Sequence, residues 1–238
     1  MQTLRSDRQG VATAEIEQLF GAQVFTFPKP SSLIRELVRA TAGEGDLVLD
    51  FFAGSGTTGA AILSLNAEDD ADRRFILVSS TESTELEPEK NLCRDVCAER
   101  LRKVIAGEGR DGPVPGDFAY LRTRRIAWDD VLYELDDAEV WLLLQLRHAR
   151  VLRAFDTAAA LQIAPPDPDR PEEATIAFLP EPTDTAVAEV RRLALLGPVV
   201  AFSLIPGPLR DALALPAVPI EQVPGQLLSE FPRLIAGL

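Results

Sequence analysis

A short apolar run that ends in a glycine turn constrains the fold of this chain more than any other feature. Residues 47–52 (LVLDFF) are followed by Ala53, Gly54, Ser55 and Gly56, and residues 57–65 then have the composition of a helix. An apolar run of this kind is typical of a buried parallel strand. Glycines between a strand and a helix let a ligand reach the backbone and meet free N–H groups at the helix start. We therefore expect a strand-turn-helix corner that binds a carboxylate or a phosphate.

Alternating helix-like and strand-like segments surround this corner. Helices are predicted at residues 31–42, 57–65 and 89–105, strands at 47–52 and 75–78, and one or two helical turns within 13–20. Two prolines hold residues 25–30 (FTFPKP) extended, and a polar turn is expected at 66–72. Helices that alternate with strands imply a parallel sheet, so the chain is predicted to have an α/β fold.

The C-terminal half repeats this alternation on a smaller scale. After a glycine-rich loop at 107–116, a strand is predicted at 118–121 and a helix at 138–161. The proline-rich, charged residues 164–173 are predicted to form a linker. We therefore expect a first domain at 1–163 and a small α/β accessory domain at 174–238. Its predicted strands are 176–179 and 199–203, and its predicted helices lie near 184–196 and 208–213.

Composition and charge limit the partners and the location of the chain. Its 238 residues suffice for one large domain or for a domain with a small appendage. No apolar stretch approaches the roughly 20 residues that span a bilayer, and the N-terminus lacks the apolar core of a secretory signal. We therefore expect a cytoplasmic protein with no membrane partner. A formal net charge of -13 argues against a surface that binds nucleic acid throughout.

The cysteines, the histidine and the basic residues offer few further candidates for functional sites. Cys93 and Cys97 are the only cysteines, and a spacing of four within a predicted helix favours neither a disulfide nor a zinc site. We interpret them as packing residues in a reducing compartment, and no metal site is expected. His148 lies among arginines and is expected at the surface. Residues 122–125 (RTRR) are the densest basic cluster and a candidate contact for DNA phosphate.

The glycine pattern by itself admits more than one class of protein. Gly54, Gly56 and Gly59 satisfy the glycine fingerprint of dinucleotide-binding proteins, which leaves a dinucleotide-dependent oxidoreductase open. No Lys-Ser or Lys-Thr pair follows these glycines, which argues against a P-loop nucleoside triphosphatase.

Several motifs around the corner narrow the choice when they are taken together. They are residues 50–58 (DFFAGSGTT), 65–69 (LNAED), 73–78 (RRFILV), Glu82, residues 27–30 (FPKP) with Leu33 and Ile34, and the basic helix at 91–104. Over about residues 14–105, the chain resembles the modification subunits of type III restriction systems and related adenine-N6 DNA methyltransferases. The resemblance implies a Rossmann-like methyltransferase sheet that is incomplete because its upstream strands are missing. It also implies S-adenosyl-L-methionine as cofactor and DNA methylation in a restriction-modification system.

The resemblance assigns roles to individual residues. The methionine part of S-adenosylmethionine is expected in a cradle made by Asp50, Phe52, Ala53, Gly54, Ser55, Gly56 and Thr57. Lys29 and Ser31 stand where the family places groups near the methionine carboxylate, and a cation and a hydroxyl both attract an anion. Glu82 follows the second strand, where an acid accepts hydrogen bonds from ribose hydroxyls. Residues 79–81 (SST) depart from the family pattern, however, and Glu85 is a nearby competitor.

The catalytic motif of these methyltransferases is expected to be missing from the chain. In the family, an acidic or polar residue, two prolines and an aromatic residue hold the flipped adenine, and this motif precedes the cofactor motif. The 24 residues upstream of Phe25 do not contain it, and residues 164–167 (APPD) lack both the acid and the aromatic residue. We therefore assign no catalytic residue and expect the isolated chain to be inactive.

Three explanations for the missing motif remain open: a gene fragment, a split enzyme, and a remnant that binds the cofactor or a partner without catalysis. Methyl transfer to the exocyclic amine of a flipped adenine would need a protein partner with the catalytic and target-recognition segments, or a homodimer. DNA would then be held mainly by the missing or separate half. A sheet without its upstream strands would leave an apolar edge that favours partner binding or low stability.

The two aromatic residues after the predicted strand have a separate expectation: one of Phe51 and Phe52 is expected in the core.

Overall fold

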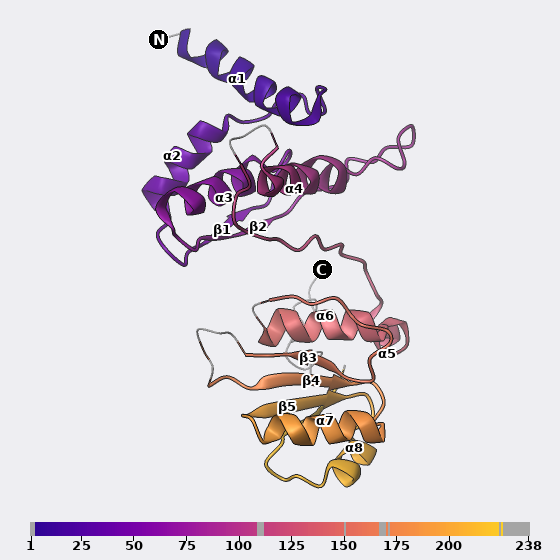
Figure 1. The fold of residues 1–238 in the computed structure, drawn as a ribbon. Coiled ribbons are helices and arrows are strands. Elements are labelled where there is room, and N and C mark those ends of the chain that lie inside the picture. The colour runs from indigo at the N-terminus through magenta and orange to yellow at the C-terminus, as the bar shows by residue number, and fades with distance from the viewer. Residues whose placement is uncertain are drawn as a thin grey trace. The chain divides into compact units, whose positions relative to one another are not determined.

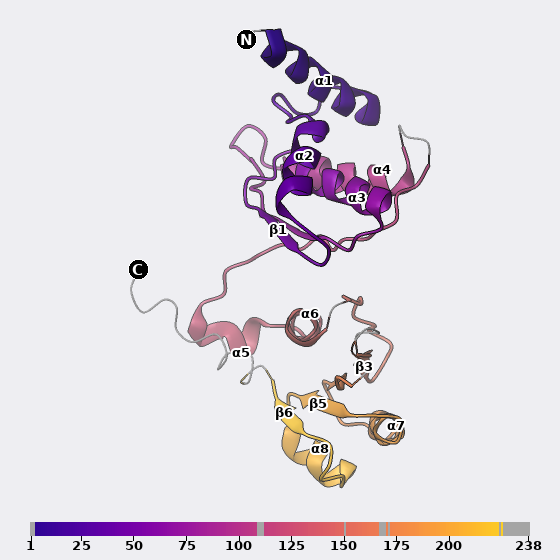
Figure 2. The same ribbon diagram turned by 90° about the vertical axis from the view of Figure 1, so that its left-hand side faces the viewer.

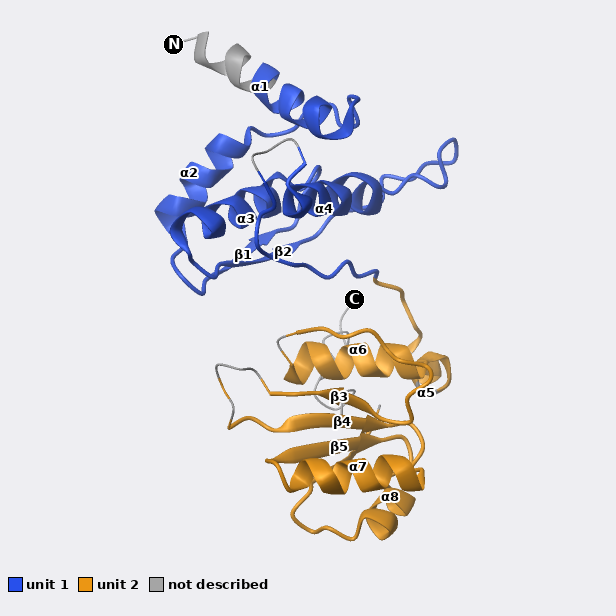
Figure 3. Ribbon diagram, viewed as in Figure 1, with its two compact units in different colours: residues 1–122 blue, residues 123–238 orange. Residues whose placement is uncertain are grey.

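The chain folds into two compact units, residues 1–122 and residues 123–238 (Figure 3). The computed structural model describes residues 3–108, 112–149, 151–166, 170, 172–223 and 225, with residues 3–9, 128 and 132 described by their backbone alone. It has a mixed α/β fold, as the alternating pattern predicts. Within these described ranges, no helix combines the length and the apolar character that crossing a membrane requires.

Unit 1 contains two parallel strands and the helices that cover one of their faces (Figures 1 and 2). Its elements are α1 (Thr3–Phe20), α2 (Ser31–Thr41), β1 (Leu47–Asp50), α3 (Thr57–Asp69), β2 (Arg74–Leu77), a π-helix (Cys93–Ala98) and α4 (Glu99–Ala106). The two strands are in register from Leu47 opposite Arg74 to Asp50 opposite Leu77. The carboxyl ends of both strands therefore meet at the edge where the predicted corner lies.

The helix α3 is the centre of the unit 1 core. All of its residues from 57 to 65 are buried. Two clusters of buried apolar side chains fix it, one toward α4 (Ala60, Leu63, Leu101, Val104) and one toward α2 (Val38, Ile62, Leu65). Its N-cap, Gly56, offers no side chain to cap the helix. Burial on all sides, rather than capping, therefore anchors the start of α3.

The two strands are more exposed than the sequence predicts. Val48, Phe75 and Leu77 pack toward the helices, whereas Leu49 is 57% exposed and Ile76 is 48% exposed. Apolar side chains lie on both faces of this pair of strands, but among the described residues of unit 1 the helices cover only one face. The expectation of buried strands is therefore wrong for one face of this two-stranded sheet.

Several helix and strand boundaries also differ from those that the sequence predicts. The helix α1 begins at Thr3 rather than near residue 13, and residues 118–121 do not form the predicted strand. The helix α3 continues to Asp69, past its predicted end at residue 65, because the Asn66 amide bonds to the backbone N–H and C=O of Arg73 and stabilises the polar end of the helix.

Unit 2 is a three-layer α/β/α structure (Figure 1). Its elements are a 3₁₀ turn (Trp128–Asp130), α5 (Val131–Glu134), α6 (Asp137–His148), β3 (Gln162–Ala164), β4 (Thr175–Leu179), α7 (Asp184–Ala194), β5 (Val199–Ser203), α8 (Pro206–Leu213) and β6 (Ile220–Gln222). The strand order is β3-β4-β5-β6, with β3 antiparallel to β4 and the other pairs parallel. The helix α6 covers one face of this sheet, and α7 and α8 cover the other.

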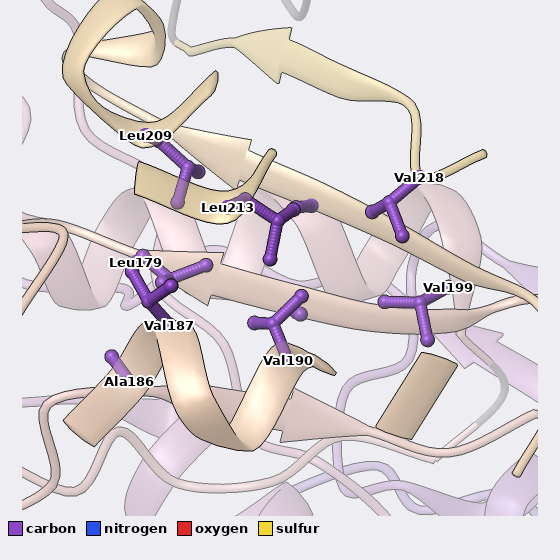
Figure 4. Close-up of a cluster of buried hydrophobic side chains, with 10 residues drawn as sticks. Leu179, Ala186, Val187, Val190, Val199, Leu209, Leu213 and Val218 are labelled. Atoms are coloured by element: carbon purple, nitrogen blue, oxygen red, sulfur yellow. The ribbon is translucent and has the colours of Figure 1, made fainter. Parts of the chain in front are cut away.

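Each face of the unit 2 sheet has its own hydrophobic cluster. Figure 4 shows the cluster beneath α7 and α8, where Val187 and Val190 meet Leu179 of β4 and Leu209 and Leu213 of α8. On the opposite face, buried side chains of α6 meet those of the sheet (Val140, Trp141, Leu144, Ala164, Ile176, Phe178, Phe202, Val223). The predicted strands and helices between residues 174 and 213 are thus confirmed.

The boundary between the units lies at residues 122/123, about 40 residues before the predicted one. The helix α6 belongs to unit 2, and it ends at His148 rather than at 161, because the Gln145 amide bonds to the backbone of Arg153 where the chain folds back. The predicted linker at 164–173 instead connects β3 to β4, which pair with Ile163 opposite Ala177. Of this segment, residues 167–169 and 171 lie outside the described residues. These proline-rich residues therefore connect two strands of one sheet rather than two domains.

Candidate functional site

The turn at residues 51–56 joins the end of β1 to the start of α3, as the sequence predicts. Gly54 has a φ of 51° and Gly56 a φ of 75°, values that favour glycine. A Cβ on Gly56 would lie 2.9 Å from Cys97 Sγ, and one on Gly54 would lie 3.1 Å from the ring of Phe25. Both conformation and close packing therefore require glycine at this turn.

Backbone donors gather at this turn. The N–H of Ala53 donates to Val78 O at 3.1 Å, and the N–H of Gly56 donates to Ala53 O at 2.8 Å. Within the described residues, the N–H groups of Gly54 and Ser55 have no acceptor. They lie beside the N-terminus of α3, whose first N–H groups also lack intrahelical acceptors. Such an arrangement attracts a carboxylate or a phosphate.

Asp50 shapes the turn from the end of β1. Its half-buried carboxylate accepts a hydrogen bond from the Phe52 N–H at 3.0 Å and one from the Thr58 hydroxyl at 2.5 Å. These two contacts connect the strand end to both the turn and the first turn of α3. Asp50 therefore lies in the predicted site and has a structural partner there.

The FPKP segment and the start of α2 contact the same region. The Thr57 hydroxyl donates to the carbonyl oxygen of Lys29 at 3.4 Å, and the Lys29 side chain is exposed. Ser31 begins α2, and its hydroxyl donates to a carboxylate oxygen of Glu15 at 2.9 Å. The structure thus brings the backbone of Lys29 to the glycine turn, whereas the Ser31 hydroxyl is engaged by Glu15, an acid outside the predicted site.

Glu82 lies in the loop after β2 and has a φ of 54°. This left-handed conformation is uncommon for a residue with a side chain, and such residues are often found at functional sites. The Glu82 carboxylate lies 4.0 Å from Lys90 Nζ. It makes no hydrogen bond to the turn within the described ranges. Glu85 is also exposed, so exposure does not separate the two acids.

The aromatic residues of the turn correct one expectation. Phe51 is 61% exposed and Phe52 is 85% exposed, with ring centroids 5.2 Å apart. Neither ring belongs to the core, because both follow the end of β1 and pack against each other rather than beneath the helices of unit 1. Both are free to contact a ligand or another polypeptide.

Arg100 and Glu15 are site residues that sequence reasoning missed. Arg100 belongs to the predicted basic helix, but it is only 3% exposed and donates to the hydroxyls of Ser55 at 3.2 Å and Thr57 at 2.8 Å. Burial lowers the pKa of its guanidinium, and the neighbouring Glu15 carboxylate opposes this shift. The signal was available, because Arg100 follows the buried Val96 by four residues and precedes the buried Val104 by four.

One of the two cysteines, which we interpret as packing residues, packs against the turn. Both are free thiols, and Cys97 is buried beside Gly56. Burial raises the pKa of the Cys97 thiol to about 12, so the thiol stays protonated at neutral pH. In the described parts of the chain, no group of three or more His, Cys, Asp or Glu side chains could hold a metal ion.

Arg124 of the basic cluster and His148 differ from their predicted roles. Arg124 pairs with Glu139 at 2.7 Å and with Glu134 at 3.1 Å, so this arginine is committed to unit 2 rather than free for phosphate. His148 is half-buried, and its ring centroid lies 5.3 Å from that of Phe202. It is therefore a packing residue rather than a surface one.

Comparison with known proteins finds a family whose sequence model matches part of unit 1. Residues 5–85 match the sequence model of a family described as DNA methylase. The chain is 38% identical over 133 residues to the type III restriction-modification enzyme StyLTI Mod subunit of Salmonella typhimurium, a match that covers 53% of this chain and 20% of the relative. It is 48% identical over 71 residues to the EcoPI Mod subunit of Escherichia phage P1, covering 30% and 11% of the two chains. It is 45% identical over 69 residues to the type II methyltransferase M.KpnI of Klebsiella pneumoniae, covering 29% and 16%. The chain thus spans a fifth or less of the length of these relatives.

Proposed function

Because these matches confirm the predicted resemblance to adenine-N6 DNA methyltransferases of the type III modification-subunit kind, we propose that unit 1 binds S-adenosyl-L-methionine for methylation of DNA. The observation that carries the proposal is the glycine turn, where the N–H groups of Gly54 and Ser55 have no acceptor within the described residues. The fold assigned to unit 1 in this proposal is a partial Rossmann-like methyltransferase sheet.

The groups around the turn fit the charges of this cofactor. Its methionine carboxylate would accept from the turn N–H groups and meet the positive end of α3 and the Lys29 ammonium. Asp50 would hold the turn in shape and stand beside the methionine ammonium. Glu82 would accept hydrogen bonds from the ribose hydroxyls, which requires the loop after β2 to approach the turn. Phe52, exposed beside the turn, would cover the ligand.

The bound cofactor supplies an electrophilic methyl group, and the acceptor in this proposal is the exocyclic amine of a flipped adenine. The acid-Pro-Pro-aromatic motif does not occur in these 238 residues. The group that holds the adenine is therefore proposed to come from another polypeptide or from a further segment. The net charge of -13 supports placing most of the DNA grip there as well. The compartment proposed for this reaction is the cytoplasm.

A second candidate is a module that binds the cofactor or a partner without catalysing transfer. It is favoured by the absence of an adenine-holding motif from these residues. Methylation assays of the chain, alone and with the product of the neighbouring gene, separate the two candidates. DNA methylation that appears only with the partner supports a split enzyme, and cofactor binding without methylation in either case supports the module.

Calorimetry with the full chain tests the cofactor proposal. S-adenosylmethionine and S-adenosylhomocysteine are expected to bind, and NAD is not. Lys29→Ala is expected to weaken binding about tenfold or more, because it removes a charge-assisted contact. Lys103→Ala is the matched control. Lys103 lies on α4 and pairs with Glu108, so this substitution should leave the affinity unchanged. Binding of NAD in place of the methyl donor would reject the proposal.

A further inference from the structure

Arg100 is a buried cation placed behind the glycine turn. Its side chain is 4% exposed, one guanidinium nitrogen donates to the hydroxyls of Ser55 and Thr57, and the other lies 3.5 Å from a carboxylate oxygen of Glu15. Its Nε is buried and has no acceptor within the described residues. Burying an arginine is costly unless its charge is paired and its donors are used. The cost indicates that this position does more than fill space.

The contacts of Arg100 connect segments that are far apart in the sequence. Through Ser55 and Thr57 it holds the turn before α3, and through Glu15 it reaches α1. Glu15 in turn accepts from the Ser31 hydroxyl at the start of α2. The turn, α1, α2 and α4 are therefore joined by one polar network.

The turn needs such a tether because its backbone is intrinsically adaptable. Gly54 and Gly56 both have positive φ and no side chain that would restrict them. A binding turn works only when its donors are held within a few tenths of an ångström by the surrounding residues. The Asp50 carboxylate holds the strand side of the turn, and the hydroxyls of Ser55 and Thr57, on its helix side, are both bound by Arg100.

We propose that Arg100 is a positioning residue that fixes the glycine turn for the methyl donor, and that Glu15 couples α1 to the same task. The inference rests on the proposed function for the identity of the ligand, but the tethering of the turn stands on the contacts alone. Arg100 does not touch the donor. It acts through Ser55 and Thr57.

Arg73 provides a matched control for a purely structural role. It is also buried, at 8% exposure, and it forms a two-contact ion pair with Asp69. It lies at the opposite end of α3, where it also donates to Ala42 O. Its loss should therefore destabilise unit 1 without disturbing the turn.

The test uses Arg100→Met, Arg100→Lys and Arg73→Met in the full chain. Calorimetry with S-adenosylmethionine, well below each melting temperature, is expected to show about tenfold or weaker binding for Arg100→Met and less than about a twofold change for Arg73→Met. Arg100→Lys should recover part of the loss, because it keeps a charge and a donor for the hydroxyls. Glu15→Gln should weaken binding a few-fold.

Hydrogen exchange of residues 51–58 provides a readout that does not need the ligand. Arg100→Met is expected to accelerate exchange in this stretch, and Arg73→Met is not. Thr57→Val keeps the side-chain shape and removes the hydroxyl, so it should mimic part of the effect and add little on top of Arg100→Met. If Arg100→Met does not fold, Arg100→Lys and Thr57→Val decide the question.

The outcomes distinguish this inference from the proposed function. If the wild-type chain binds no methyl donor, the proposed function fails, and hydrogen exchange alone decides whether Arg100 tethers the turn. If Arg100→Met and Arg73→Met lower the melting temperature alike, and both leave donor affinity and exchange of the turn unchanged, the positioning role is overturned.

Discussion

Gly56 meets two requirements at once, a left-handed backbone and close contact with the π-helix. Its φ is 75°, and an added Cβ would lie 2.9 Å from Cys97 Sγ and 3.1 Å from Cys97 O. We predict that Gly56→Ala lowers the free energy of unfolding of unit 1 by about 2–4 kcal/mol, through backbone strain and overpacking. Urea denaturation followed by far-ultraviolet circular dichroism measures the change.

Gly45 is the control for this prediction. Its φ of 74° is nearly the same, but an added Cβ there would meet nothing within 4 Å. Gly45→Ala should therefore cost only the backbone term, about 1 kcal/mol. Equal losses for the two variants would show that the contact with Cys97 is unimportant.

Single residues were predictable where their role is local. The glycine turn, Asp50 and Lys29 were located from short motifs, and Asp50 and the Lys29 carbonyl both contact the first residues of α3, although their part in binding a ligand stays a prediction. Arg100 and Glu15 were not, because their partners lie at least 16 residues away in the sequence. No local pattern states that a charged side chain is buried against a distant hydroxyl or carboxylate.

Among the secondary-structure elements, β1 and β2 have an exposed apolar face. Leu49 and Ile76 point away from the helices, whereas Val48 packs toward them. We predict that Leu49→Asp changes the free energy of unfolding by less than about 0.5 kcal/mol and lowers the binding of an apolar dye and concentration-dependent self-association. Dye fluorescence and light scattering measure these effects.

Val48→Asp is the matched inward substitution on the same strand. It places a charge against Phe75 and α3 and is expected to unfold unit 1. A wild-type chain that neither binds the dye nor self-associates would mean that this face is covered in solution.

For the whole molecule, the hydrophobic clusters lead to a prediction about independent folding of the units. Both hydrophobic clusters of unit 2 are built from residues of unit 2 alone. We predict that residues 123–238 fold when expressed alone. Trp128 and Trp141 are the only tryptophans, and the buried Trp141 stacks on Phe178 with ring centroids 6.4 Å apart. Tryptophan fluorescence therefore reports on unit 2.

The midpoint of the fluorescence transition in urea should be the same for the fragment and the full chain, with free energies of unfolding that agree within about 0.5 kcal/mol. It should also stay constant in Gly56→Ala, whose effect belongs to unit 1. A fragment with the emission of an unfolded chain, or a midpoint that moves with Gly56→Ala, would contradict independent folding.

The sequence by itself determined the α/β alternation, the glycine corner and the resemblance of unit 1 to DNA methyltransferases. Each of these features depends on a pattern of a few residues, because apolar periodicity and glycine conformation are local properties of the chain. Only the tertiary structure decided that α6 and β3 belong to unit 2, that Arg100 is buried behind the turn, and that Leu49 and Ile76 are exposed on one face of the sheet of unit 1. Each of these depends on contacts between segments far apart in the chain, and the energy of burying a side chain is set by those contacts rather than by its neighbours in sequence.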